Sequence, residues 1–196
     1  MRITEVKLRQ LIRESLENDD DDESYGFLGF GSKPSWMPDI PAGVMTTVSS
    51  NPIAGIRDTS RQCGYGRKPR GLWYAPGTAW IDWMQSEMPS WLAAVNHVYT
   101  VQPIYAQGGL NSRGGVLQLQ SPRAMRDFSR RFAVEGGREI NWSEVTDFWD
   151  GIEIIPSQYD MANDMTMFWY WGWDIPSGCI WRPEGVTEFK LLASNS

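Results

Sequence analysis

Aromatic residues and turn formers alternate closely along the stretch KPRGLWYAPGTAWIDWM, from Lys68 to Met84. It holds three tryptophans and a tyrosine between several glycines and prolines. An indole ring buries a large apolar surface while its N–H stays polar, so tryptophans collect in cores and in binding clefts alike. Glycine and proline confine each element to a few residues. The stretch therefore predicts either the edge of a packed hairpin or one wall of a pocket for a flat ligand.

Composition indicates one soluble globular domain with a charged tail. The chain has 196 residues, of which 41% are apolar, 21% are charged and eleven are tryptophan. Its net charge is −6, but Asp19 to Glu23 (DDDDE) carries most of it and leaves about −1 for the rest. Such an acidic run is typical of a solvated linker. Bulk charge therefore argues neither for nor against a nucleic-acid partner.

The N-terminal part predicts a helix tethered to the domain. Residues 1–17 carry an apolar stripe at helical spacing, and Thr4 is placed to cap the helix. Residues 18–42 are acidic and then rich in Gly and Pro, which predicts a linker, and residues 43–196 form the folded domain. We expect the helix either to dock on its own domain or to act as a packaging or partner-docking tag.

Short apolar patterns predict more strands than helices. The expected strands cover residues 43–50, 71–75, 97–104, 114–120, 151–155 and much of 167–192. The expected helices cover residues 51–56, 78–92 with a break at Pro89, 123–132 after the cap Ser121–Pro122, and a short segment near 142. This pattern indicates an α+β fold of two packed, mainly antiparallel sheets with flanking helices.

Several classes of site are excluded by missing motifs. The chain has no phosphate-binding P-loop and no dinucleotide fingerprint. Its one histidine, His97, falls in a predicted strand and is expected to be structural, because a zinc site needs further ligands at suitable spacing. Cys63 and Cys179 lie far apart and are expected to be reduced thiols. We therefore expect no metal site.

One acid lies on an otherwise apolar predicted strand. Glu153 follows Trp149–Asp150–Gly151 in the segment WDGIEII. Burying a charged carboxylate is costly unless it is paired or opens on a cleft. The preceding turn is placed to bring Glu153 to the rim of a pocket, and a solvent-facing strand position is the alternative.

Three segments, in this order, resemble the NAD-binding core of the ADP-ribosyltransferases, the group of poly(ADP-ribose) polymerases and related toxins. They are SSNPIAGI, GLWYA and DGIEI. In that group a first strand contacts the nicotinamide ribose, a second strand stacks an aromatic ring on nicotinamide, and a later strand presents the catalytic glutamate. The resemblance covers about Gly43 to Pro156 and implies an ADP-ribosyltransferase-like fold with NAD as the donor substrate.

The resemblance assigns roles by position within these segments. It places Thr46 or Thr47 at the ribose contact, Trp73 and Tyr74 at the nicotinamide wall, and Glu153 as the catalytic acid. The first strand lacks the family's histidine or arginine, so a hydroxyl takes the ribose contact. The Glu153 carboxylate would stabilise the positive charge that develops on the ribose as nicotinamide leaves. Residue 151 is glycine, so the Glu-x-Glu or Gln-x-Glu pair of many transferases is absent, which argues against arginine-directed modification.

Basic residues precede GLWYA. They are Arg57, Arg61, Arg67, Lys68 and Arg70, against one acid, Asp58. We assign Arg57 to the pyrophosphate of NAD, and Arg67, Lys68 and Arg70 to a phosphate-bearing acceptor. A solvated basic loop is the alternative. A second basic cluster, Arg123, Arg126, Arg130 and Arg131, lies on a predicted helix, where a solvated face is the preferred interpretation.

The sequence thus predicts an NAD-dependent ADP-ribosyltransferase that modifies a macromolecular acceptor, protein or nucleic acid, and releases nicotinamide. The tethered helix resembles leader segments of phage and marine bacterial proteins, so a toxin-like phage effector in the host cytoplasm fits. We expect a monomer without a membrane partner, since no stretch approaches the roughly 20 apolar residues of a membrane span. A non-enzymatic, tryptophan-rich module for a sugar, base or peptide is the competing prediction. An RNA 2′-phosphotransferase is a third, which the lone His97 disfavours.

Overall fold

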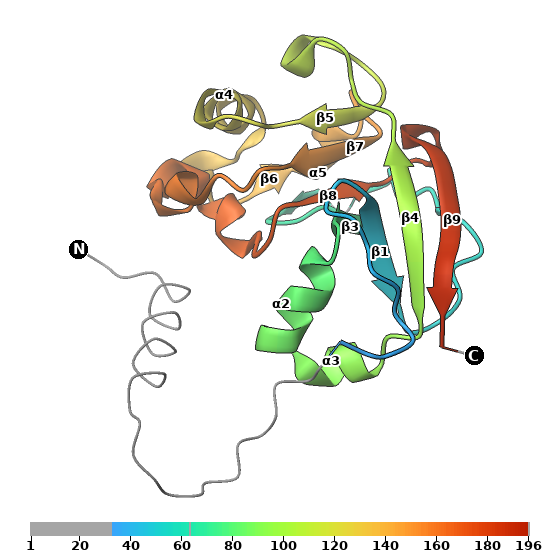
Figure 1. Ribbon diagram of the computed structural model, residues 1–196. Helices are drawn as coiled ribbons and strands as arrows, with labels where there is room; N and C mark the ends of the chain where they lie inside the picture. The colour runs from blue at the N-terminus through green and yellow to red at the C-terminus, as the bar shows by residue number, and fades with distance from the viewer. Residues whose placement is uncertain (1–32, 63, 196) are drawn as a thin grey trace, which may run out of the picture.

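The computed structural model describes residues 33–62 and 64–195, which form a mixed α+β fold (Figure 1). The predicted helix at residues 3–17 and the acidic run lie outside this part of the chain. No helix in the described ranges is long and apolar enough to cross a membrane.

Seven strands of the described part form one curled sheet in the order β5-β7-β8-β3-β1-β4-β9. Neighbours are antiparallel except β5 and β7, which are parallel. The short strands β2 and β6 pair as a separate ribbon. The bounds are β1 Met45–Ser49, β2 Tyr65–Gly66, β3 Leu72–Pro76, β4 His97–Pro103, β5 Val116–Gln118, β6 Ile140–Asn141, β7 Gly151–Ile154, β8 Ser177–Ile180 and β9 Val186–Ser194.

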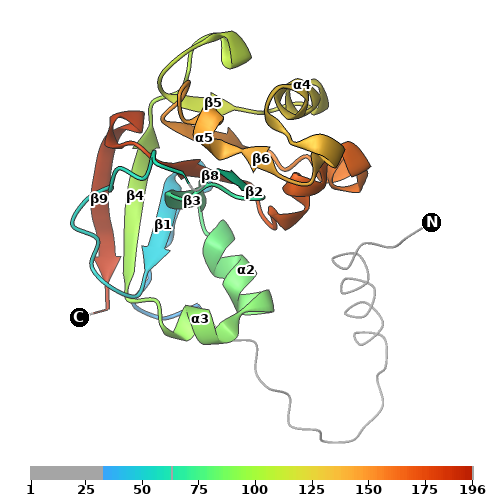
Figure 2. The same cartoon turned by 180° about the vertical axis from the view of Figure 1, so that it is seen from behind.

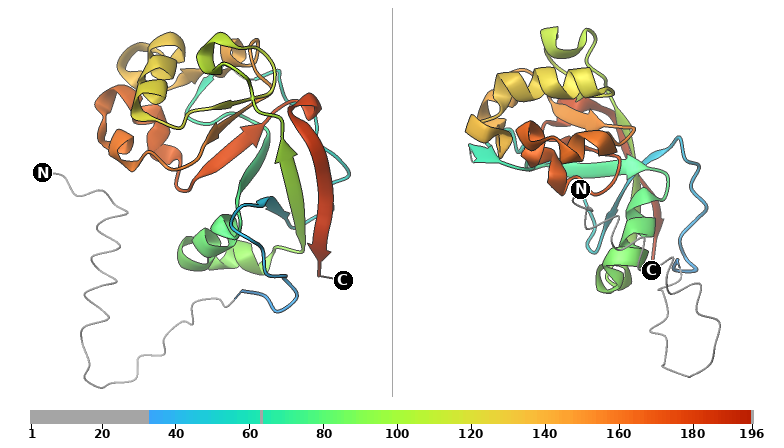
Figure 3. Two further views of the ribbon diagram at one scale, coloured as in Figure 1. Left: turned by 45° about the horizontal axis from the view of Figure 1, so that its top comes forward. Right: turned by 90° about the vertical axis from the view of Figure 1, so that its left-hand side faces the viewer.

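Two separate groups of helices cover one face of the sheet (Figure 3). The α-helices are α2 Ala79–Glu87, α3 Pro89–Ala93, α4 Pro122–Phe132 and α5 Trp142–Val145. The 3₁₀ helices are η1 Gly109–Asn111, η2 Glu135–Gly137, η3 Tyr159–Asn163, η4 Met165–Gly172 and η5 Pro183–Gly185. One group, α4, α5 and η4, packs on β5, β7 and β8. The other group, α2 and α3, packs near β1, β3 and β4. The core is accordingly divided into two clusters of buried side chains on this face.

The segment between β1 and β2 crosses the opposite face, which is turned toward the viewer in Figure 2. The amide of Ile53 donates to the Tyr99 hydroxyl at 2.8 Å, and the amide of Thr59 donates to the Trp181 carbonyl at 2.8 Å. Ile56 packs on a third buried cluster that contains Tyr74. These contacts hold the segment in an extended course.

The main helix predictions are confirmed, and the local causes are visible. Ser121 caps α4 by accepting a hydrogen bond from the Ala124 amide at 3.2 Å, and Met125, Phe128 and Phe132 are buried. Pro89 starts α3 and separates it from α2, because proline cannot continue the hydrogen bonding of the preceding helix.

Three expectations about the fold are wrong. Residues 51–56 form no helix, since Pro52 biases Asn51 away from helical angles and tertiary contacts hold the segment extended. The aromatic run at 165–172 is the 3₁₀ helix η4, because its rings pack in the core instead of alternating across a sheet. The strands form one curled sheet and a small ribbon, not two packed sheets.

Residues just before the expected domain start also pack on the fold. Met37 is buried with Ile81 and Leu92, and Trp36 and Ile40 pack against the same cluster. The described end of the predicted linker thus contributes apolar side chains to the core beneath α2 and α3.

Candidate ligand-binding site

A cavity of about 530 Å³ lies where the two clusters on the helical face meet. Trp73 on β3 lines it and also packs against the first cluster. Trp80 and Trp83 on α2 line it and pack against the second cluster. Trp91 on α3 lines it too, and its 57% exposure places it at the opening. Four indole rings, one from strand β3 and three from the helices α2 and α3, therefore line one space.

The indoles on the helical side form an edge-to-face chain. The ring centroids of Trp80 and Trp83 are 5.9 Å apart at an interplanar angle of 83°, and those of Trp83 and Trp91 are 6.3 Å apart at 65°. On the sheet side, Trp73 is held by the edge of Trp173, at 4.9 Å between centroids. Such contacts fix ring orientation, so the walls of the cavity are preformed.

The polar groups of the lining are small and uncharged. The polar residues of the lining are Thr47, Ser49, Ser50 and Ser90, and the side chains of the described lining include no carboxylate, carboxamide, lysine or arginine. A positive charge lies against one wall, since Lys68 Nζ is 5.5 Å from the Trp73 ring centroid. The same Nζ pairs with Asp174 at 3.5 Å. The cavity can stack a flat ring and offer it a few hydrogen bonds.

Glu153 is at a different place, buried on the other face of the sheet with 2% exposure. Its Oε2 accepts hydrogen bonds from the hydroxyls of Tyr74, at 2.9 Å, and Tyr105, at 3.0 Å. Its Oε1 accepts one from the side-chain amide of Gln118 at 2.9 Å. Three neutral donors thus satisfy the carboxylate, which compensates part of the cost of its burial.

The same cluster suppresses ionisation of its tyrosines. Burial, followed by the neighbouring Glu153 carboxylate, raises the pKa of Tyr74 well above its ordinary value. Burial and then the same carboxylate raise the pKa of Tyr105 as well. Both hydroxyls therefore stay protonated as donors. Burial also raises the pKa of the Cys179 thiol, which argues against a role as nucleophile.

Strand register explains why Trp73 and Glu153 do not share a cavity. One cross-strand row consists of Leu117, Ile152, Cys179 and Trp73. The adjacent row consists of Gln118, Glu153, Gly178 and Tyr74. Successive side chains of a strand point to opposite faces, so the first row faces the helices and the second faces away. The predicted wall and the predicted acid are therefore on opposite sides of β3.

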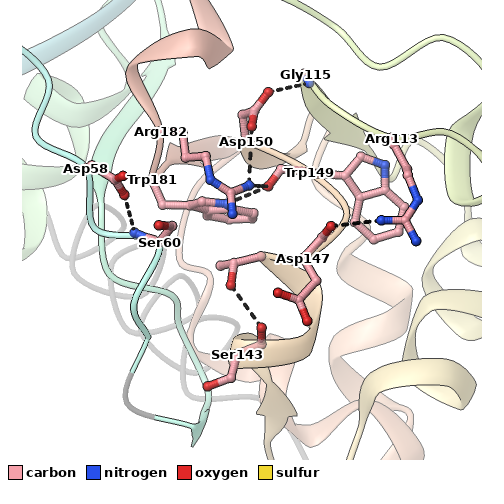
Figure 4. A network of polar contacts seen from close by, with 11 residues as sticks. Asp58, Ser60, Arg113, Gly115, Ser143, Asp147, Trp149, Asp150, Trp181 and Arg182 are labelled. Atoms are coloured by element: carbon pink, nitrogen blue, oxygen red, sulfur yellow. Dashed lines mark hydrogen bonds and ion pairs between the residues drawn. The ribbon is translucent and has the colours of Figure 1, made fainter.

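The turn before β7 is fixed in a network of polar contacts (Figure 4). The Gly115 amide donates to Asp150 Oδ2 at 2.6 Å, and Arg182 Nη1 lies 3.4 Å from Asp150 Oδ1. The Trp149 carbonyl accepts from Trp181 Nε1 at 2.7 Å and from Arg182 Nη1 at 3.1 Å. The turn is thereby tied to the start of β5 and the end of β8, and Glu153 lies buried within the sheet instead of at a pocket rim.

The remaining predicted contacts are dispersed. The Thr46 hydroxyl is buried and donates to the Gly77 carbonyl at 2.7 Å, whereas Thr47 lines the cavity with Trp73. Arg57 is exposed on the segment that crosses the opposite face. The guanidinium of Arg67 lies 4.6 Å from the Phe168 ring centroid.

Arg70 and His97 belong to local structure. The amide of Arg70 donates to Gln62 Oε1 at 2.8 Å, and its carbonyl accepts from Gln62 Nε2 at 2.9 Å. His97 Nδ1 lies 2.7 Å from the Asn96 carbonyl oxygen. No group of three or more His, Cys, Asp or Glu suited to a metal occurs among residues 33–62 and 64–195.

Sequence reasoning missed two partners of Glu153 and the second wall of the cavity. Tyr105 and Gln118 reach Glu153 from other segments, and a single sequence carries no signal for these pairings. The helical spacing of Trp80, Trp83 and Trp91 was a usable signal for a shared apolar face. It did not indicate that this face borders a cavity.

Comparison with known proteins returned no match, whether to a family model, a curated protein or a solved structure.

Proposed function

We propose that this protein is a binding module that holds a planar heteroaromatic ring, such as a nucleobase or nicotinamide, in its tryptophan-lined cavity. The observation that carries the proposal is the convergence of Trp73, Trp80, Trp83 and Trp91 on one space of about 530 Å³. Apolar and aromatic walls with a few placed polar groups are typical of small-molecule sites.

The chemistry of the lining favours a flat aromatic ring over a sugar. A sugar presents hydroxyls around its whole rim, and burying them without partners is costly. The polar residues of the described lining are only Thr47 and three serines, and the lining contains no carboxylate or carboxamide side chain. A heteroaromatic ring has two apolar faces and few polar edge atoms, which matches these walls.

Stacking sets the expected strength of binding. Stacking on an aromatic side chain contributes about 1–3 kcal/mol per base. With a few hydrogen bonds added, we expect a dissociation constant for a single nucleoside of about 0.1–1 mM.

The test is an NMR titration of ¹⁵N-labelled protein with adenosine, nicotinamide and, as a non-aromatic control, glucose. We expect the indole signals of Trp73, Trp80, Trp83 and Trp91 to shift with the aromatic compounds. The signals of Trp149 and Trp181, which are buried away from the cavity, stay in place. The absence of cavity shifts with either aromatic compound, or equal shifts with glucose, contradicts the proposal.

A second candidate is NAD-dependent ADP-ribosyl transfer on an ADP-ribosyltransferase-like core, with Glu153 as the catalytic acid and a protein or nucleic acid as acceptor. The observation that favours it is the buried Glu153 carboxylate, which is held by three neutral donors. Burying a carboxylate costs free energy, so its presence in the core favours a functional role. It requires NAD to approach from the side of Tyr105, which is half-buried, and not through the cavity of Trp73.

Release of nicotinamide from NAD tests this candidate. We expect Glu153→Gln to lower the rate by about 100-fold or more if the carboxylate stabilises charge on the ribose. Glu188→Gln, at an exposed position on β9, serves as the matched control and keeps the rate. If the unaltered protein releases no nicotinamide with protein or nucleic-acid acceptors present, this candidate fails while the binding proposal stands.

A further inference from the structure

Beside the cavity, a positive charge lies against one of its walls. Lys68 Nζ is 5.5 Å from the Trp73 ring centroid, and Trp73 lines the cavity. The ammonium is paired only loosely with Asp174, at 3.5 Å, and the two side chains are 40% and 46% exposed. Exposed ion pairs contribute little to stability, so an incoming anion can replace Asp174 at small cost.

The same side of the molecule carries a solvent-facing stack of aromatic rings. Phe168 and Trp171 on η4 are stacked at 5.6 Å between centroids with an interplanar angle of 26°. The guanidinium of Arg67 lies 4.6 Å from the Phe168 centroid, and Trp171 is 47% exposed. A methyl group at Gly172 would lie 3.4 Å from Lys68 Cε. The stem of Lys68 thus runs beside the end of η4, between this stack and Trp73.

From these contacts we infer that the partner is a single-stranded nucleic acid. One base occupies the tryptophan cavity, its phosphate lies at Lys68 and Arg67, and a neighbouring base stacks on Trp171. This inference rests on the proposed function for the placement of the first base. Basic side chains interleaved with exposed aromatic rings are the combination by which proteins hold single strands without reading their sequence. A duplex keeps its bases stacked on each other and has none to offer to the cavity.

The alternative for the exposed rings is a purely structural cation–π arrangement. That alternative accounts for Arg67 on Phe168, but it does not explain why an uncharged aromatic cavity lies beside Lys68. A strand accounts for both features, because its rings are neutral and its charge is confined to the phosphates. The cavity takes the neutral part and Lys68 takes the charge.

The experiment compares adenosine, AMP, a ten-nucleotide single strand of deoxyadenosines and its duplex with the complementary strand. We expect AMP to bind about tenfold more tightly than adenosine, the effect of one partly exposed charge-assisted contact. We expect the single strand to bind more tightly than AMP, and the duplex to bind more weakly than the single strand. The affinity for the strand should fall with salt, with a slope of about −0.7 per phosphate contacted.

Variants separate a binding role of Lys68 from a structural one. We expect Lys68→Gln, which keeps the stem, to remove the advantage of AMP over adenosine and to reduce the salt slope. Asp174→Asn breaks the same ion pair but keeps the ammonium, so it should bind AMP at least as tightly as the unaltered protein. Lys190→Gln, on the edge strand β9, is the matched control and should change neither measurement.

Each part can be overturned separately. If adenosine and AMP bind equally, the phosphate contact is wrong while the binding proposal stands. If the strand binds no more tightly than AMP, or the duplex binds as well as the strand, the single-strand assignment is wrong. Equal loss of affinity in Lys68→Gln and Asp174→Asn indicates a structural ion pair and overturns the role given to Lys68. If adenosine itself does not bind, the proposed function fails as well.

Discussion

At the scale of single residues, Glu153 shows how a buried acid is made tolerable without a cation. Its two oxygens receive three hydrogen bonds, from Tyr74, Tyr105 and Gln118. Each donor is neutral, so the cluster exchanges the hydration of one carboxylate for directed dipoles. The arrangement also fixes the protonation state of the tyrosines, because ionising either one would place a second negative charge beside the first.

Stability should therefore decline at alkaline pH. The raised pKa values of Tyr74 and Tyr105 mean that the folded state keeps protons that the unfolded state releases above its ordinary tyrosine pKa of about 10. Unfolding then releases protons, and the free energy of unfolding falls as pH rises, by up to about 1.4 kcal/mol per pH unit for each proton released. Urea unfolding between pH 8 and 11 measures the slope.

Substitutions identify the residues responsible for that slope. Tyr74→Phe should flatten it, and should also cost about 1–3 kcal/mol at neutral pH because Glu153 loses a donor. Tyr159→Phe, at a ring that is 64% exposed, should leave both the slope and the stability unchanged. An unchanged slope in Tyr74→Phe contradicts the account of the cluster.

At the scale of elements, the hydrogen bond from Tyr74 on β3 to Glu153 on β7 passes over a glycine of β8, the strand between them. Tyr74 is paired with Gly178 of β8, which is paired in turn with Glu153 of β7. A methyl group on Gly178 would lie 2.3 Å from Tyr74 Cζ, and real side chains essentially never approach so closely. The absence of a side chain at Gly178 is what allows the Tyr74 hydroxyl to reach across one strand.

Gly178→Ala should therefore destabilise the protein by about 1–3 kcal/mol, as other overpacked core positions do. Gly55→Ala, at a position with no atom within 4 Å of the added methyl group, is the control and should be close to neutral. Thermal unfolding of both variants provides the comparison. Equal stability of Gly178→Ala and the unaltered protein would show that Tyr74 does not cross β8 as described.

Elements with strong local signals were predictable from the sequence, and elements fixed by distant contacts were not. The α4 helix has a cap, a proline in its first turn and an apolar stripe, all read from adjacent residues. Residues 51–56 lack such signals, and their extended course depends on Tyr99 and Trp181, which are far away in the sequence. The 3₁₀ helix η4 was missed because its aromatic run suits a strand as well as a packed turn.

At the scale of the whole molecule, the order of strands in the sheet separated residues that the sequence had joined into one site. Trp73 and Glu153 were predicted as parts of a single pocket, but register places them on opposite faces. That outcome depends on β8 lying between β3 and β7, a pairing that arises late in the chain and has no local signature. Of the predicted site, Trp73 and Thr47 line one cavity.

The central claim is that this cavity holds a planar ring, and obstructing it tests the claim most directly. Ala93 and Ala94 are both exposed, but only Ala94 belongs to the lining of the cavity. We expect Ala94→Trp to weaken binding of adenosine by at least about tenfold, or 1.4 kcal/mol, with unchanged thermal stability, as measured by NMR titration. Ala93→Trp adds the same side chain outside the cavity and should bind adenosine like the unaltered protein. Unchanged affinity in Ala94→Trp, or equal losses in both variants, would contradict the account.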